Sequence, residues 1–244
     1  MTMIRNHSTL AVFAIVGLFV SAPGLTATFG NILTPGVEFP LGAVSFADAV
    51  VDYSPGIVYD PGFDDFIPFP IYRVAESALG VPDVVDIQSV NECTAENSTV
   101  VCPFVSLGVG GSLTVQFTDN LLTGGGTADA DLWIFEAGPP EPTYVDISPD
   151  GINWFSVGLW PGFTIGVDID AFGFGVNDSF AFVRLTDDPI SGNTTGITVG
   201  ADIDAIGAIS SVTVVPLPAA AWLFASALSI MGLRCRRSPS APVS

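Results

Sequence analysis

Glycine and proline interrupt the central part of this chain so often that only short elements of secondary structure fit between them. The chain has 26 glycines and 19 prolines in 244 residues. Both residues weaken the interior of a helix, and both are common in tight turns. No segment between residues 28 and 213 keeps a 3.6-residue apolar period over the length of a helix. We therefore expect short β-strands joined by turns.

Alternation of polar and apolar residues places several of these strands. It runs over Ser112–Phe117 and over Tyr144–Ser148, as in strands with one buried face. Pro149–Gly151 then predicts a turn, and Trp154–Val157 its returning hairpin partner. These segments predict an all-β domain folded as a single antiparallel β-sandwich of the jelly-roll type. Further strands are expected over residues 44–53, 130–135, 180–186 and 205–215.

The N-terminal residues are typical of a secretory signal peptide. Arg5 precedes an apolar run, Leu10–Val20, and Leu25–Ala27 supplies the small residues of a cleavage site. We expect cleavage after Ala27, which leaves an exported domain over residues 28–213.

The C-terminal residues predict a membrane span. Val214–Leu233 carries no charge, and as a helix it would rise ~30 Å, about one hydrocarbon core. An arginine cluster follows at once, which by the positive-inside rule places the short tail, residues 238–244, in the cytoplasm. The sandwich is thus expected to lie between an N-terminal signal peptide and a C-terminal transmembrane helix.

This C-terminal stretch, residues 214–237, resembles the PEP-CTERM sorting signal of Gram-negative bacteria. A Pro-x-Pro motif, an apolar helix and an arginine cluster occur in the same order, although Leu217 stands where the name-giving glutamate would be. The resemblance implies an inner-membrane precursor that an exosortase-like protease processes for delivery to the cell surface or exopolysaccharide matrix. The residues that carry it are Val215, Pro216, Leu217, Pro218, Arg234, Arg236 and Arg237.

The charge balance excludes several kinds of function. The chain has 25 acidic residues and 6 basic ones, and between the two terminal signals only Arg73 and Arg184 remain against all 25, a net charge of −23. Such a surface repels nucleic acid and anionic lipid. The single histidine, His7, lies in the signal peptide, and the chain has no lysine. The exported domain therefore cannot form a catalytic triad that needs histidine, a His-ligated zinc site or a lysine Schiff base.

Acidic residues near glycine-rich segments are candidate ligands for a structural Ca²⁺, which takes six to eight oxygen atoms from carboxylates and carbonyls. Asp202 and Asp204 form the first candidate pair, in an expected loop, and Asp129, Asp131 and Glu136 are further candidates. The alternatives are that these are ordinary solvated carboxylates, or that the charge reflects a salty habitat.

Two cysteines lie in the exported domain, Cys93 and Cys102, and in an oxidising compartment they predict a disulfide. The third, Cys235, lies beyond the expected membrane span and has no partner there.

Four groups of segments together resemble a discoidin-like, galactose-binding-like β-sandwich module. That resemblance implies a jelly roll and, in many relatives, a structural Ca²⁺ and a surface that faces glycans. Trp160 is expected in a loop and so exposed to a sugar, whereas Trp133 and Trp154 are expected in the core, and Arg184 is expected to pair with a carboxylate. The segments are Ala78–Asp83, Val105–Phe117, Asp131–Glu136 with Tyr144–Val157, and Phe182–Thr186 with Gly200–Ala205.

The sequence favours a non-catalytic exported protein that binds a cell-surface or exopolysaccharide glycan or serves as a structural component. Two alternatives remain open. One is a glycoside hydrolase or lyase that works with two carboxylates, although no particular pair is marked. The other is a purely structural, acidic, cation-binding matrix protein.

Overall fold

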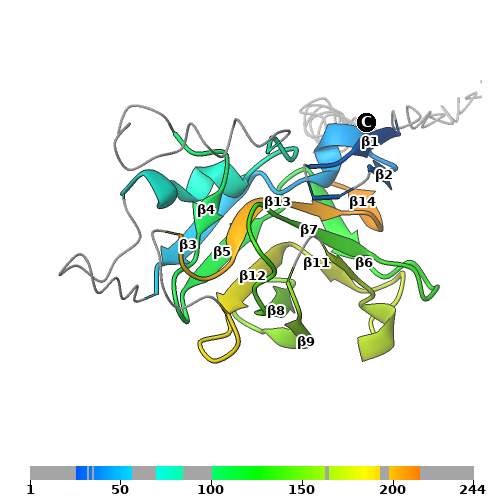
Figure 1. Ribbon diagram of the computed structural model, residues 1–244. Coiled ribbons are helices and arrows are strands. Elements are labelled where there is room, and N and C mark those ends of the chain that lie inside the picture. Colours follow the sequence, from blue (N-terminus) through cyan, green and yellow to red (C-terminus); the bar gives the residue numbers. More distant parts are fainter. Residues whose placement is uncertain are drawn as a thin grey trace, which may run out of the picture.

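The computed structural model (Figure 1) describes residues 26–31, 33–34, 36–56, 70–84, 101–162, 165–192 and 198–214. Almost all of the expected signal peptide and sorting signal, with every residue named for the sorting motif, lies outside these ranges. Among the residues described, no helix has the length and apolar character needed to cross a membrane.

The described part of the chain is all-β, and every strand pairing is antiparallel, which confirms this part of the expected fold class. The five-stranded sheet contains, in spatial order, β3 (Ala49–Ser54), β5 (Ser112–Gln116), β12 (Phe182–Asp187), β8 (Thr143–Ser148) and β9 (Phe155–Trp160). The four-stranded sheet contains β10 (Ile165–Val167), β7 (Leu132–Glu136), β13 (Asp202–Ala208) and β4 (Val105–Ser106).

The remaining elements are short. A three-stranded sheet contains β11 (Ser179–Phe180), β6 (Asn120–Thr123) and β14 (Ser211–Thr213), and β1 (Ala27–Phe29) pairs with β2 (Val37–Phe39). The helical turns in the described ranges are 3-10 helices, namely η1 (Gly42–Ser45), η2 (Pro70–Tyr72), η3 (Ala75–Ala78) and η4 (Asp170–Phe172).

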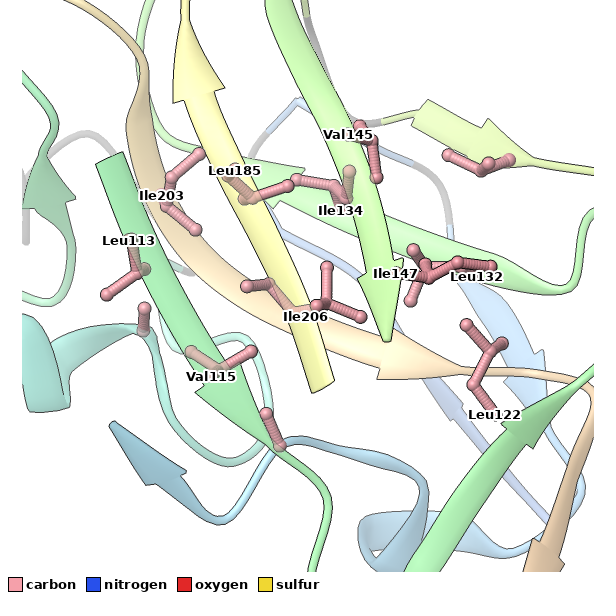
Figure 2. Packing of buried hydrophobic residues seen from close by; sticks show 14 of the residues in the cluster. Leu113, Val115, Leu122, Leu132, Ile134, Val145, Ile147, Leu185, Ile203 and Ile206 are labelled. Carbon is pink, nitrogen blue, oxygen red and sulfur yellow. The ribbon is translucent and has the colours of Figure 1, made fainter. Parts of the chain in front are cut away.

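The two larger sheets share one hydrophobic core. Alternate residues of β5 and β12, such as Leu113 and Leu185, point toward residues of β7 and β13, such as Ile134 and Ile206 (Figure 2). Burying each such side chain contributes roughly 1.5–3 kcal/mol. This layer explains the strict alternation of β12, in which Val183 and Leu185 are fully buried between partly exposed residues.

The outer face of the four-stranded sheet is covered by the N-terminal segment. Phe39 of β2 and Phe46 after η1 lie 4.6 Å apart between ring centroids, and both pack against Phe135 of β7. Trp133, which was expected in the core, is partly buried and packs against the same cluster, so it shares one face of its strand with Phe135. A β-carbon at Gly207 would lie 2.6 Å from the Phe39 ring, so the close approach of this cluster requires glycine there.

Both edges of the five-stranded sheet carry a β-bulge. On β3 the register shifts between Val50 and Asp52, which leaves Val51 without an opposite residue on β5. At the other edge the pairing of β8 with β9 shifts between Tyr144 and Asp146, and Gly158 of β9 has a φ of 105° there. The expected hairpin of these two strands is otherwise confirmed.

Two expectations about loops are wrong. Asp202 and Asp204 lie inside strand β13 rather than in a loop, because this strand is buried along its whole length between the core and the N-terminal segment. The strand expected over residues 205–215 accordingly ends at Ala208 and is followed by the separate strand β14. Trp160 is the last residue of β9 and packs against the core.

Cys102 is disulfide-bonded and buried beside Phe104 and Tyr72. Cys93 lies outside the described residues, so its pairing with Cys102 stays a prediction. We expect alkylation of the unreduced, denatured domain, residues 28–213, to label no thiol, and alkylation after reduction to label two. One or two labelled thiols before reduction would contradict the pairing.

Candidate functional site

A row of polar side chains crosses the outer face of the five-stranded sheet. The strand register places Asp52, Thr114, Arg184, Asp146 and Ser156 next to one another on five successive strands. Core residues lie on either side of this row, so by the alternation of a strand the row belongs to the opposite face of the sheet. Asp52 and Ser156 at its ends are exposed, Arg184 and Asp146 are partly exposed, and Thr114 is buried.

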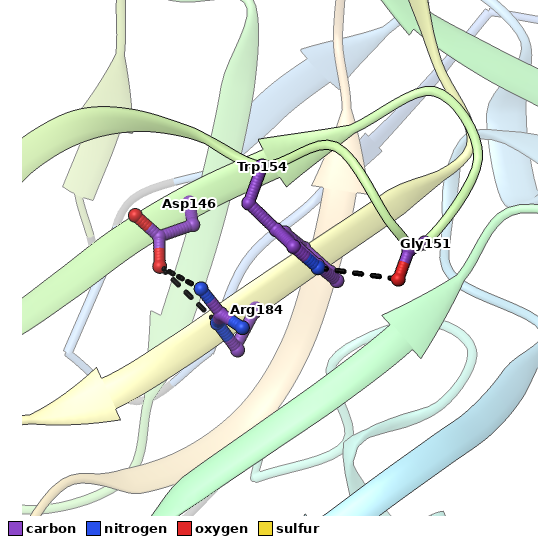
Figure 3. Close-up of polar contacts among 4 residues, drawn as sticks. All are labelled: Asp146, Gly151, Trp154 and Arg184. Atoms are coloured by element: carbon purple, nitrogen blue, oxygen red, sulfur yellow. Dashed lines mark hydrogen bonds and ion pairs between the residues drawn. The ribbon is translucent and has the colours of Figure 1, made fainter.

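Arg184 is the centre of this row. Its Nη2 and Nε atoms donate to Oδ2 of Asp146 at 2.7 and 3.1 Å, which confirms that Arg184 pairs with a carboxylate. The guanidinium carbon lies 4.3 Å from the centroid of the Trp154 ring (Figure 3). Such a cation–π contact adds ~0.5–1 kcal/mol at a partly exposed site. The charged head of Arg184 is thereby fixed between Asp146 and Trp154.

The turn between β8 and β9 fixes Trp154. The Asp150 carboxylate accepts hydrogen bonds from the backbone N–H groups of Asn153 and Ile152, at 2.8 and 2.9 Å, and these bonds lower the pKa of Asp150 to about 2. Gly151 has a φ of 73°, as a turn of this kind requires. The Trp154 Nε1–H donates to the Gly151 carbonyl at 3.2 Å (Figure 3). Trp154 was expected in the core, but this turn holds it, partly exposed, over Arg184.

Aromatic and apolar groups flank the polar row. Tyr144 is 40% exposed, and Leu159 opposite it on β9 is 46% exposed. On the other side of the row Phe182 lies between Gln116 and Ser148. Exposed aromatic rings bind the C–H faces of sugars, while neighbouring polar groups bond to hydroxyls. This face therefore offers both kinds of contact that a glycan needs.

A separate group of carboxylates is suited to a cation. Asp131, Asp168 and Asp170 each place an oxygen atom within 4.8 Å of the other two. Asp131 is buried and accepts the Ile169 N–H at 3.0 Å, and Asp170 accepts the Gly126 N–H at 2.9 Å. Burial raises the pKa of Asp131, and the neighbouring Asp170 charge raises it further. A hard cation such as Ca²⁺ suits three converging carboxylates.

Asp202 and Asp204 are buried with protein donors around them. The Ser106 hydroxyl donates to Asp202, while Asp204 accepts from the Asp83 N–H at 3.0 Å and from Asn31 Nδ2 at 3.2 Å. Burial is the main cause that raises the pKa of each carboxyl to about 7.

The five metal candidates from the sequence do not form one group. Only Asp131 belongs to the carboxylate group described above. Asp129 is exposed and bonds to Thr127 at 3.1 Å, and Glu136 is buried and accepts the Glu141 N–H at 3.2 Å. Asp168 and Asp170 were not among the candidates, although they are spaced as Asp-x-Asp, as Asp202 and Asp204 are.

Trp160, the candidate sugar-binding residue, lies away from the outer face of the sheet. Its Nε1–H donates to the Val157 carbonyl at 3.0 Å, and its ring packs against the core. With Glu136, Glu141 and Thr143 it lines a cavity of about 10 Å³, room for roughly one water molecule.

Comparison with known proteins finds a solved structure of low similarity. No family model matches the chain, and no curated protein matches it. Among solved structures, the C-terminal domain of a chitobiase from Bacteroides fragilis is 17% identical, with a TM-score of 0.30 over 43% of this chain. The match spans 65% of that domain, less than two thirds of its length. A similarity this low carries no argument about function.

Proposed function

We propose that residues 28–213 form a single jelly-roll sandwich that is exported, has no catalytic activity, and binds a glycan on the outer face of its five-stranded sheet. The observation that carries the proposal is the group formed by Trp154, Arg184 and Asp146. Its geometry is fixed by the cation–π contact and by two charge-assisted hydrogen bonds. A site fixed in this way loses little conformational entropy when it binds.

The covering of the two sheets supports this choice of face. Phenylalanine rings of the N-terminal segment pack on the four-stranded sheet, whereas the five-stranded sheet exposes Tyr144, Leu159 and the ends of its polar row. The absence of histidine and lysine from residues 28–213 supports a binding role over catalysis.

The test compares Trp154→Ala with Ile152→Ala. Ile152 lies on the same turn and is 81% exposed, so the control removes exposed apolar surface without touching Arg184. On an array of bacterial exopolysaccharides and their oligosaccharides, we expect Trp154→Ala to weaken binding about tenfold, or about 1.4 kcal/mol, and Ile152→Ala to change little. Failure of the unaltered domain to bind any glycan, or equal behaviour of the two variants, would contradict the proposal. Release of reducing ends from a bound glycan would favour the hydrolase or lyase alternative.

We further propose that the protein is sorted by an exosortase-like protease and reaches the cell surface or matrix, with the inner membrane holding its precursor. The support is the order of the Pro-x-Pro motif, apolar stretch and arginine cluster in the sequence.

We expect the mature protein to end near Pro216–Ala221, because processing at the motif removes the apolar stretch and the arginines behind it. The intact mass of protein shed into the medium or matrix measures this. A mass that still includes Arg234–Ser244 would show that the C-terminal stretch is a plain anchor.

A second candidate function is that of an acidic, cation-binding structural component of the matrix. The convergence of Asp131, Asp168 and Asp170 favours it, and a structural Ca²⁺ is the ion we propose there. This role and glycan binding use different residues, so one protein can perform both.

A further inference from the structure

The polar row on the five-stranded sheet has a direction that constrains its ligand. It runs across the strands, from Asp52 on β3 to Ser156 on β9. Neighbouring strands are ~4.8 Å apart, so the row spans roughly 19 Å. A chain of equatorially linked pyranose rings advances by about one strand spacing per ring. An extended oligosaccharide laid along the row therefore crosses a new strand at each sugar, and the accessible polar groups are those on β3, β12, β8 and β9, because Thr114 on β5 is buried.

The charge of the site constrains the ligand further. Asp146 neutralises Arg184, which leaves the row with the negative charge of Asp52 and no free cation among its five residues. The surrounding domain holds 25 acidic residues and two arginines. A polyanionic glycan that approaches this face would be repelled by the negative charge of the domain. Within about one Debye length of the surface, physiological salt screens that repulsion only partly. The row therefore disfavours uronate, sulfate and phosphate polymers.

Arg184 and Asp146 together present donors beside an acceptor. Both hydrogen bonds from Arg184 end on Asp146 Oδ2, and the two side chains remain 35% and 20% exposed. Arginine has five N–H donors, of which this pairing uses two, and a carboxylate has acceptor sites on both oxygens. Such a pair can bond two adjacent sugar hydroxyls at once, one through the guanidinium and one through the carboxylate.

We propose that the outer face of the five-stranded sheet binds an uncharged, extended glycan, with about one sugar ring per strand and a vicinal diol held by Arg184 and Asp146. Tyr144, two residues from Asp146 on β8, supplies an exposed ring beside the chain. This inference rests on the proposed glycan-binding function and adds the class of glycan to it.

The experiment uses the exported domain and isothermal titration calorimetry with defined oligosaccharides. The uncharged probes are gluco-, manno-, xylo- and galacto-oligosaccharides of two to six rings, and the anionic probe is oligogalacturonate of the same lengths. For the uncharged series that binds, we expect affinity to rise at least tenfold from two rings to five and then to level off, because the row ends. We expect oligogalacturonate to bind at least tenfold more weakly at low salt.

Arg184→Lys is the matched variant, since it keeps the charge and removes the forked donor geometry. We expect it to weaken binding of the uncharged hexamer about tenfold, and Thr213→Ala, at an exposed residue of β14 in another sheet, to leave binding nearly unchanged. If Arg184→Lys lowers the melting temperature, the same binding measurement is made on Asp146→Asn. The amide of asparagine donates hydrogen bonds from its nitrogen, where the carboxylate oxygen only accepts them. Two outcomes would overturn the inference: Trp154-dependent binding that is stronger for oligogalacturonate, or binding that is equally strong for two rings and for six. Either outcome would still support the proposed glycan-binding function. Absence of Trp154-dependent binding to every probe would overturn the proposed function itself.

Discussion

Raising the pH from 4 to 8 should markedly lower the free energy of unfolding of the domain formed by residues 28–213. Burial raises the pKa of Asp202 and of Asp204 to about 7 in the folded state, against 3.8 for an aspartate exposed to water in the unfolded chain. Between these values the folded protein binds more protons than the unfolded chain. Stability is therefore fully present below pH 4 and is lost as the pH rises through 7. One pKa unit corresponds to 1.36 kcal/mol, so the loss is on the order of several kcal/mol when both groups ionise.

Asp202→Asn separates this effect from general charge repulsion. The partners of Asp202 include the hydroxyls of Ser106 and Thr198, which can accept a hydrogen bond as well as donate one. The variant should therefore fold well, be more stable than the parent at pH 8, and lose part of the pH dependence. Glu38→Gln, which removes one exposed charge, should leave the slope nearly unchanged. Urea denaturation at pH 4, 5.5, 7 and 8 measures the free energy of unfolding of each protein and the slope of that free energy with pH. Equal slopes for all three proteins would show that these buried carboxyls do not control stability.

Calcium should raise the melting temperature of the same domain through Asp131, Asp168 and Asp170. A ligand that binds only the folded state adds RT ln(1 + [L]/Kd), about 2.7 kcal/mol at a hundredfold excess over Kd. NaCl at matched ionic strength should not reproduce the shift, because screening lacks the specific coordination of three carboxylates. Differential scanning fluorimetry with and without a chelator measures it.

Three double variants identify the ligands. Asp168→Asn with Asp170→Asn should abolish the calcium-specific shift. Glu38→Gln with Asp52→Asn, which removes two exposed charges, should keep it. Asp202→Asn with Asp204→Asn should keep it as well. Loss of the shift only in this last variant would restore the sequence-based ligand assignment, and an equal response to Na⁺ and Ca²⁺ would remove the site altogether.

The sequence predicted the elements whose signals are local. Strand β5 alternates clearly, and the turn that joins β8 to β9 has proline, aspartate and glycine in the positions that a turn needs. Strand β13 was misplaced because it is buried along its whole length, so its sequence has no alternation to show. The two aspartates within it looked like loop residues for the same reason.

The candidate glycan site was harder to predict, because it depends on strand register. The sequence indicated that Arg184 would pair with a carboxylate, but Asp146 lies 38 residues earlier and becomes its neighbour only through the pairing of β12 with β8. Trp154 reaches Arg184 only because of the turn geometry at Gly151. The periodicity of a single segment predicts neither the Asp146–Arg184 pair nor the position of Trp154 over Arg184.

The bulges on β3 and β9 bear on how copies of this protein behave when crowded together. An exposed edge strand presents unpaired N–H and C=O groups to which a strand of another molecule can add. Here each outer strand is interrupted, at Val51 and around Gly158, so neither offers a long flat ladder. The sheet is thus poorly suited to continue from one molecule into the next. Copies held side by side would remain separate units instead of joining edge to edge into fibrils.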